Sequence, residues 1–124
     1  MIQDQTLADV NEVPVNTARG GRMQVYASPK TVGTTKLIMG STVLAPGEEV
    51  REHLHDYGEE VVLVVRGQGT LHLDGETTRI AKDMLFVAKQ GQPHRIVNDG
   101  SEELELIFAT APLAPTAASG HREV

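Results

Sequence analysis

Three histidines and a glutamate have the types and spacing that could carry chemistry in this chain. His53 and His55 are two residues apart, so their imidazoles point to the same side of an extended strand. An Asp-Tyr-Gly turn follows at 56–58, and Glu60 begins the next strand-like stretch. The spacing therefore predicts that the imidazoles of His53 and His55 and the carboxylate of Glu60 lie on one side of a hairpin. His94 stands at the start of a further strand-like segment.

Composition restricts what these side chains could do. The 124 residues include no cysteine, which excludes disulfides, thiolate zinc sites and cysteine nucleophiles. Any metal must therefore be held by nitrogen and oxygen. The net charge of −6 and the aromatic content of 3% argue against a nucleic-acid partner. No apolar stretch approaches the roughly 20 residues of a membrane helix, so we expect a small-molecule partner.

Short apolar or β-branched runs must position the histidines and the glutamate. Such runs lie at 36–44, 61–65, 70–73, 77–80, 84–87, 95–97 and 104–109, with turn residues between them. Short strands at intervals of about 8–12 residues are typical of a sandwich or barrel. Asp74-Gly75 predicts a type I′ hairpin turn. We therefore expect a single all-β domain.

The two ends differ from the middle. We expect an N-terminal arm over 1–35, with a short helical or extended stretch at 3–12, and a β-barrel over 36–111. The segment 112–124 is predicted to be a tail, flexible because 112–120 is rich in Ala, Pro and Ser. His121 in that tail, and His72 between two leucines, are interpreted as ordinary surface histidines.

The first histidine segment resembles the first motif of the cupin superfamily. That motif is a glycine, five residues, His-x-His, four residues, a glutamate, six residues and a glycine. Every position is filled here, by Gly47, His53, His55, Glu60 and Gly67.

The second cupin motif is matched in part. Gly91, His94 and Asn98 agree with it, whereas Asp83 replaces its first glycine and Lys89 its proline. These departures affect the turn before the strand. The resemblance covers 36–109 and implies a double-stranded β-helix, that is, a jelly-roll barrel.

The resemblance also implies a ligand set. His53, His55, Glu60 and His94 would bind one divalent transition metal inside the barrel. Three nitrogens and one oxygen suit Zn, Fe, Mn, Ni, Co or Cu, and the ligand types do not choose among them. Open positions for water or substrate would remain. Glu59 would project to the opposite side of its strand.

The flanking segments are similar to small cupin-type cyclases of aromatic polyketide and spore-pigment pathways. The similarity includes 19–22, 28–33, 52–60 and 112–115 with Gly120-His121, and departs at Leu54, Asp56 and Gly58. It implies a cytoplasmic, metal-dependent enzyme of antibiotic-type biosynthesis that closes rings of a poly-β-ketone chain by an aldol-type reaction. Removal of an acidic methylene proton and polarisation of a carbonyl are the two tasks of such a site.

Further residues are predicted for those tasks. The candidate base is a metal-bound hydroxide or a carboxylate such as Glu59, and Tyr57 would orient the chain. Met39, Phe86 and Ile96 are candidates for the cavity lining, with core packing as their other possible role.

Two other function classes are compatible with the sequence. The same ligands resemble those of cupin dioxygenases acting on an enol or flavonol-like substrate. A non-catalytic small-molecule binding module is a third possibility. The stretch 61–65 is apolar on both faces, which predicts burial of both and a homodimer.

Overall fold

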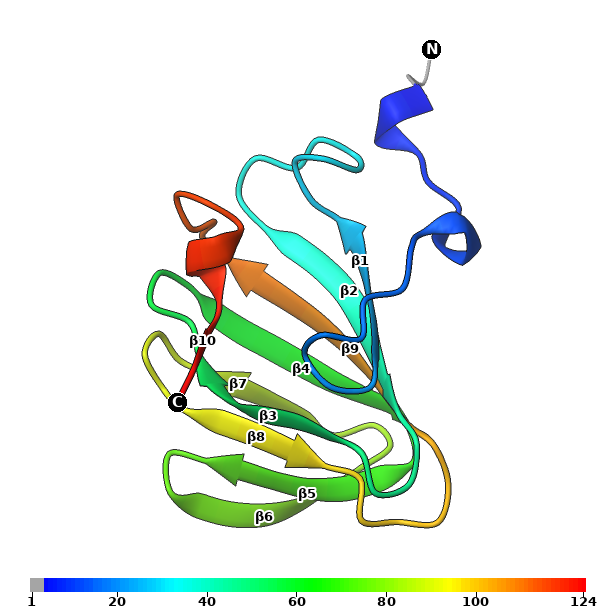
Figure 1. The fold of residues 1–124 in the computed structure, drawn as a ribbon, viewed down its shortest axis with the longest axis vertical. Helices are drawn as coiled ribbons and strands as arrows, with labels where there is room; N and C mark the ends of the chain where they lie inside the picture. Colours follow the sequence, from blue (N-terminus) through cyan, green and yellow to red (C-terminus); the bar gives the residue numbers. More distant parts are fainter. Residues whose placement is uncertain (1–3) are drawn as a thin grey trace.

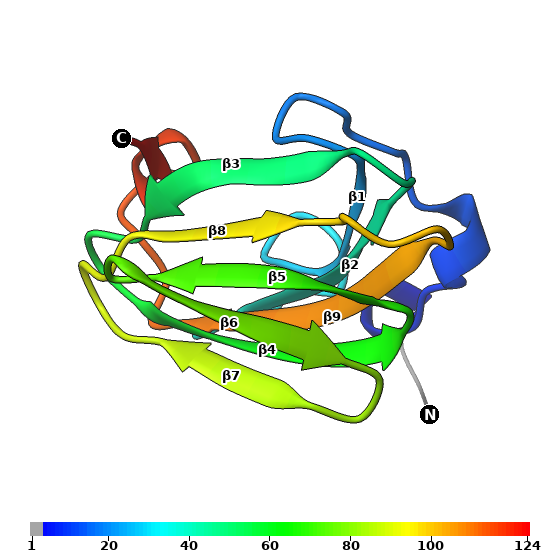
Figure 2. The same cartoon turned by 90° about the horizontal axis from the view of Figure 1, so that it is seen from below.

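Two five-stranded antiparallel sheets face one another in the computed structural model, which describes residues 4–124 (Figures 1 and 2). The first sheet has the order β1 (Arg22–Ala27), β2 (Ile38–Leu44), β9 (Leu104–Ala111), β4 (Glu59–Arg66) and β7 (Leu85–Ala88). The second has the order β10 (Arg122–Glu123), β3 (Glu49–Leu54), β8 (His94–Val97), β5 (Gln68–Leu73) and β6 (Glu76–Ala81). The predicted all-β jelly-roll fold is confirmed.

Alternation along each strand builds the core between the sheets. In β9 every second residue is buried, beginning with Leu104 and ending with Thr110, as expected for a strand with one face toward the core. Its neighbours β2 and β4 contribute Leu44, Val62 and Val64 to the same hydrophobic cluster.

The turns follow the predicted chemistry. Asp74 and Gly75 connect β5 to β6 with φ angles of 51° and 83°, which is the left-handed pair that a type I′ turn requires. Asp83 also has a positive φ of 74°. The cupin pattern places a glycine at this position because glycine adopts such a conformation without steric cost.

The segment predicted as an N-terminal arm contains part of the first sheet. β1 pairs with β2, and Asn16 forms an isolated bridge with Met23. The stretch predicted as helical or extended holds two 3-10 turns, η1 (Asp4–Thr6) and η2 (Val10–Glu12), while Gln3 lies outside the described residues. No helix among residues 4–124 is long or apolar enough to cross a membrane.

The C-terminal segment is ordered against the barrel, which corrects the flexible tail expected from its composition. After the 3-10 turn η3 (Ala118–Gly120), β10 pairs with the end of β3, as the red end of the ribbon shows in Figure 1. Arg122 makes two hydrogen bonds to the Asp56 carboxylate, each 3.0 Å long. Composition alone does not reveal this long-range pairing.

Candidate metal centre

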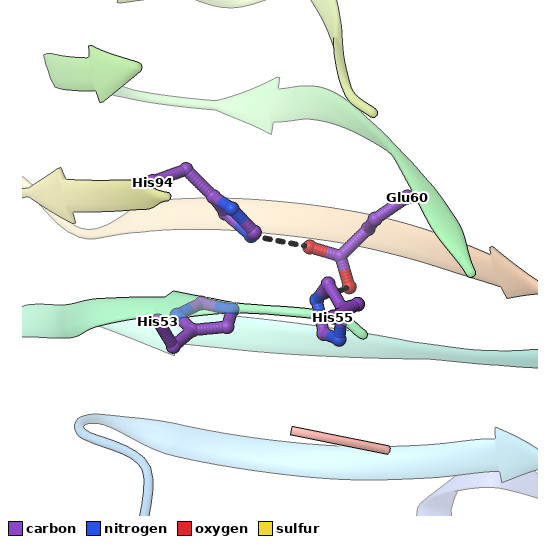
Figure 3. Close-up of side chains that lie close together, drawn as sticks. All are labelled: His53, His55, Glu60 and His94. Carbon is purple, nitrogen blue, oxygen red and sulfur yellow. Dashed lines mark ion pairs between the residues drawn. The ribbon is translucent and has the colours of Figure 1, made fainter. Parts of the chain in front are cut away.

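Three strands and one turn bring the four predicted side chains together in the barrel (Figure 3). His53 lies on β3 opposite His94, the first residue of β8. His55 follows the end of β3, and Glu60 faces it from β4. All four residues are buried, with exposed fractions between 0% for His94 and 8% for His55 and Glu60.

Each of the three imidazoles is held by its Nδ1 atom. Nδ1 of His53 lies 2.9 Å from the Arg51 carbonyl oxygen, and Nδ1 of His94 lies 2.9 Å from that of Gln92. Nδ1 of His55 lies 2.6 Å from the Gly120 carbonyl oxygen. A carbonyl oxygen only accepts, so each Nδ1 carries the proton and each Nε2 keeps a free lone pair.

The free Nε2 atoms fit a metal ion. The Nε2 atoms of His55 and His94 are buried without a hydrogen-bond partner among the described residues, although each lies 3.4 Å from a Glu60 oxygen. One donor atom from each of the four residues falls within 4.8 Å of the others. Fixing the tautomer through a second hydrogen bond is the usual preparation of a metal-binding histidine. The donor set could therefore hold a divalent transition metal.

The charges of the cluster are mutually dependent. Burial raises the pKa of Glu60, but the adjoining His55 and His94 outweigh it and keep this pKa below its ordinary value. Burial and then the charge of His94 lower the pKa of His53 to about 3. Burial lowers the pKa of His55, but the adjoining Glu60 and the Gly120 carbonyl outweigh it and raise that pKa. The cluster therefore keeps an ionised carboxylate beside a neutral His53, and a metal bound at His55 would take the place of a proton on its Nε2.

The cluster opens into a cavity of about 670 Å³ between the two sheets. Apolar side chains from both sheets line most of it, among them Val25, Ile38, Ile96 and Phe108. Residues of the N-terminal segment and of 113–121 complete the wall. Such a cavity is typical of a small-molecule site.

His121 is a cavity residue that the sequence analysis assigned to the surface. Its ring stacks on His53 with centroids 4.2 Å apart, and its Nε2 is buried without a partner among residues 4–124. Burial and then the Arg19 charge lower the pKa of His121 to about 4. The similarity of Gly120-His121 to the cyclases was the one sequence signal that pointed to it.

Other predicted site residues lie elsewhere. Glu59 is exposed, and Tyr57 is 45% exposed beside a smaller pocket that includes His55. Neither lines the main cavity.

Of the three side chains expected in the lining, Ile96 is there. Met39 is 40% exposed and is not part of the lining. Phe86 packs against the core, which was its other predicted role. Their positions follow from strand alternation: Met39 is out of phase with the inward Ile38.

Asn98 is structural, as predicted. It is fully buried, and its Nδ2 donates hydrogen bonds to the carbonyl oxygens of Leu44 and Glu102, each 2.8 Å long. It therefore fixes the chain after β8.

Comparison with known proteins places this site in a family. Residues 40–110 match the family model described as Cupin domain. The chain is 40% identical to polyketide synthase CurC of Streptomyces cyaneus over 93% of its length and 75% of that protein. It is 31% identical to the tetracenomycin polyketide synthase protein TcmJ of Streptomyces glaucescens, over 95% of its length and 83% of that protein.

A solved structure supports the fold. The polyketide cyclase RemF from Streptomyces resistomycificus matches 100% of this chain and 86% of its own chain, with a TM-score of 0.77 at 15% identity. Together with the matched family model and the two Streptomyces relatives, the buried three-histidine, one-glutamate cluster identifies this chain as a member of the cupin family.

Proposed function

We propose that this chain is a metal-dependent polyketide cyclase that closes a ring of a poly-β-ketone chain by an aldol-type reaction. The observation that carries the proposal is a buried His53–His55–Glu60–His94 cluster opening into an apolar cavity of about 670 Å³. The similarity to polyketide synthase components supports the substrate class.

The four cluster residues would hold one divalent transition metal. When bound there, such an ion supplies Lewis-acid polarisation of a substrate carbonyl. The Nδ1 hydrogen bonds of the three histidines keep their rings oriented toward a common point. Glu60 is oriented in turn by Thr110, whose Oγ1 donates a hydrogen bond of 2.9 Å to Oε2.

Among the described residues of the cavity wall, we propose His121, a neutral and weakly basic imidazole, as the group that removes the proton. Its buried Nε2 has no partner among the described residues, and the lowered pKa keeps the imidazole neutral near pH 7. A methylene between two carbonyls would transfer its proton to this nitrogen. The resulting carbon nucleophile forms a bond to a carbonyl carbon of the same chain, and that oxygen takes up a proton. Glu59, the base expected earlier, lies outside the lining.

The apolar lining has two tasks. It favours a folded conformation of the bound poly-β-ketone chain, because an extended conformer leaves apolar surface exposed to water. It also excludes water from the carbon nucleophile. These tasks belong to residues such as Val25 and Phe108.

Ring closure before and after metal removal tests the proposal. A poly-β-ketone substrate is incubated with protein as purified, with chelator-treated protein and with protein reloaded with single divalent metals. Product is followed by liquid chromatography and mass spectrometry. We expect closure to be lost on chelation and restored by one metal. Equal closure in the metal-free protein would contradict metal dependence, and no closure in any state would contradict the cyclase assignment.

An oxygen electrode in the same assay separates the alternative class. A cupin dioxygenase consumes one oxygen molecule per substrate, whereas aldol closure consumes none. Stoichiometric oxygen uptake would therefore replace the cyclase assignment.

We also propose that the chain forms a homodimer through the outer face of the first sheet. Leu63, Leu85 and Val87 on this face are 37%, 58% and 38% exposed, and Leu63 pairs with Leu85 across β4 and β7. Two molecules of net charge −6 repel through their charged faces. The apolar patch formed by Leu63, Leu85 and Val87 on β4 and β7 is where two copies can approach.

A further inference from the structure

The cavity wall has an unbalanced charge that the metal cluster does not explain. Its charged residues, within the described part of the chain, are Arg19, Lys30 and Glu60. Glu60 faces His55 and His94 and belongs to the cluster. Two cations are left in the wall of a protein whose net charge is −6.

Arg19 has no ion pair or hydrogen bond from its guanidinium within residues 4–124. The other arginines nearby are paired: Arg22 with Glu103 and Arg51 with Glu123. Arg19 is partly buried. The Glu123 carboxylate feels its charge but pairs with Arg51, so the hydrogen-bond donors of the Arg19 guanidinium stay available to an oxyanion. The field of Arg19 reaches the site, since it contributes after burial to the low pKa of His121.

The turn that carries Arg19 is held in place from three sides. Asn16 Oδ1 accepts a hydrogen bond of 2.8 Å from the Ala18 amide, and the Ala18 carbonyl accepts one from Arg51. The backbone of Gly20 lies so close to β3 that a Cβ there would overlap the Glu49 carbonyl oxygen. The turn leads into β1 and lies against the start of β3, so Arg19 is presented to the cavity by a fixed support.

We propose that Arg19 binds an anionic group of the cavity's ligand, a carboxylate or a phosphate. The inference rests on the proposed function for the rest of that ligand, a poly-β-ketone chain. The anion would be the terminal carboxylate of a free chain or the phosphate of a phosphopantetheine thioester. A guanidinium binds either oxyanion through two parallel hydrogen bonds. Arg19 thereby fixes which end of the chain faces the N-terminal wall.

Binding of matched charged and neutral probes tests this inference without any turnover. The probes are 2-naphthylacetate with its neutral amide, and 4′-phosphopantetheine with pantetheine, titrated calorimetrically at constant ionic strength. We expect at least one anion to bind about tenfold more tightly than its neutral counterpart, the factor supplied by one charge-assisted interaction. Preference for the carboxylate indicates a free chain, and preference for the phosphate indicates the thioester.

Three variants test whether Arg19 causes the tighter binding of the anionic probe. Arg19→Gln should abolish it and leave the binding of the neutral probe unchanged, while Arg19→Lys should retain part of it. Arg22→Gln is the matched control, because Arg22 is exposed, outside the cavity wall and paired with Glu103. Equal or undetectable binding of both members of each pair would overturn the inference, as would a preference that survives Arg19→Gln or is lost in Arg22→Gln.

The failure of this inference can be told from the failure of the cyclase proposal. Anion binding through Arg19 without ring closure would support this inference and contradict the cyclase proposal. Ring closure together with anion binding that does not depend on Arg19 would support the cyclase proposal and contradict this inference.

Discussion

At the residue scale, the three histidines of the cluster are oriented independently of one another. Each Nδ1 donates a hydrogen bond to the backbone carbonyl of a different residue. Replacing one therefore removes a ligand without reorienting the others. We expect His53→Ala and His94→Ala each to reduce bound metal from about one equivalent to a small fraction. Losing even a residue that only hydrogen-bonds to a ligand typically lowers metal affinity about 10- to 100-fold. Elemental analysis of the purified variants measures this.

His72→Ala is the matched control for that experiment. His72 lies on β5, outside the cavity lining, and its Nδ1 is 3.2 Å from the Thr77 hydroxyl oxygen. Its replacement should leave the metal content unchanged. Full metal content in both the His53 and His94 variants would contradict the ligand assignment, provided that circular dichroism shows them folded.

Replacing His121 should lower the rate of ring closure without loss of metal, unlike replacing any of the four ligands. We expect His121→Gln to lower the rate of ring closure by at least about 100-fold, the lower range for a general base, and to leave metal content unchanged. Rate and elemental analysis are measured on one preparation. An unchanged rate would remove His121 from catalysis, and loss of the metal would make it a ligand instead.

Strand alternation predicted that His53 and His55 lie together, because that relation is local. Glu60 was preferred to its exposed neighbour Glu59 on the motif count, and His94 was assigned by resemblance to the second cupin motif. His121 could not be found in this way. Its position depends on the pairing of β10 with β3 and on the Arg122–Asp56 ion pair, which join residues far apart in the chain.

At the scale of elements, turns that need positive φ angles are the most sequence-determined features. Asp83 occupies a left-handed conformation of φ 74° before β7, which costs a non-glycine residue on the order of 1–3 kcal/mol. Glycine removes that cost but makes the unfolded chain more flexible. We expect Asp83→Gly to raise the free energy of unfolding by about 1 kcal/mol, measured by urea denaturation.

Gly67→Ala is the opposite case and serves as the comparison. Gly67 has φ 84°, and a Cβ there would overlap the Glu103 carbonyl oxygen. The substitution should lower the free energy of unfolding by roughly 1–3 kcal/mol. If Asp83→Gly were destabilising to the same degree, the Asp83 side chain would contribute more than its backbone strain costs.

The interior strands were predictable and the two terminal segments were not. Runs at 61–65 and 104–109 fall within β4 and β9, because closely spaced apolar and β-branched residues mark them directly. The stretch 16–35, with Gly20, Gly21 and Gly33, was interpreted as an extended edge or arm rather than as a defined strand, and β1 is an edge strand of the first sheet. It is stabilised by its pairing with β2. Strand formation at the chain ends depends on partners that composition does not reveal.

At the scale of the whole molecule, the first sheet carries both an apolar patch and ion pairs on its outer side. Leu63, Leu85 and Val87 are exposed on β4 and β7, while Arg66 pairs with Glu105 between β4 and β9. The apolar stretch 61–65 predicted that both of its faces are covered, and its inward residues Val62 and Val64 fill the core. Its outward side is left for a partner in the proposed dimer.

A dimer joined through that face should dissociate when a charge is placed on it. Leu85 is 58% exposed on β7, the edge strand, so Leu85→Glu introduces a charge without disturbing the core. In a two-fold arrangement each interface would bury that charge twice. We expect the wild type to sediment at twice the chain mass of 13.4 kDa at micromolar concentration, and Leu85→Glu at the chain mass. Leu7→Glu is the control, because Leu7 is 71% exposed but belongs to the N-terminal segment. It should remain dimeric. A wild type that sediments as a single chain, or a Leu85→Glu variant that stays dimeric, would remove this face from the assembly.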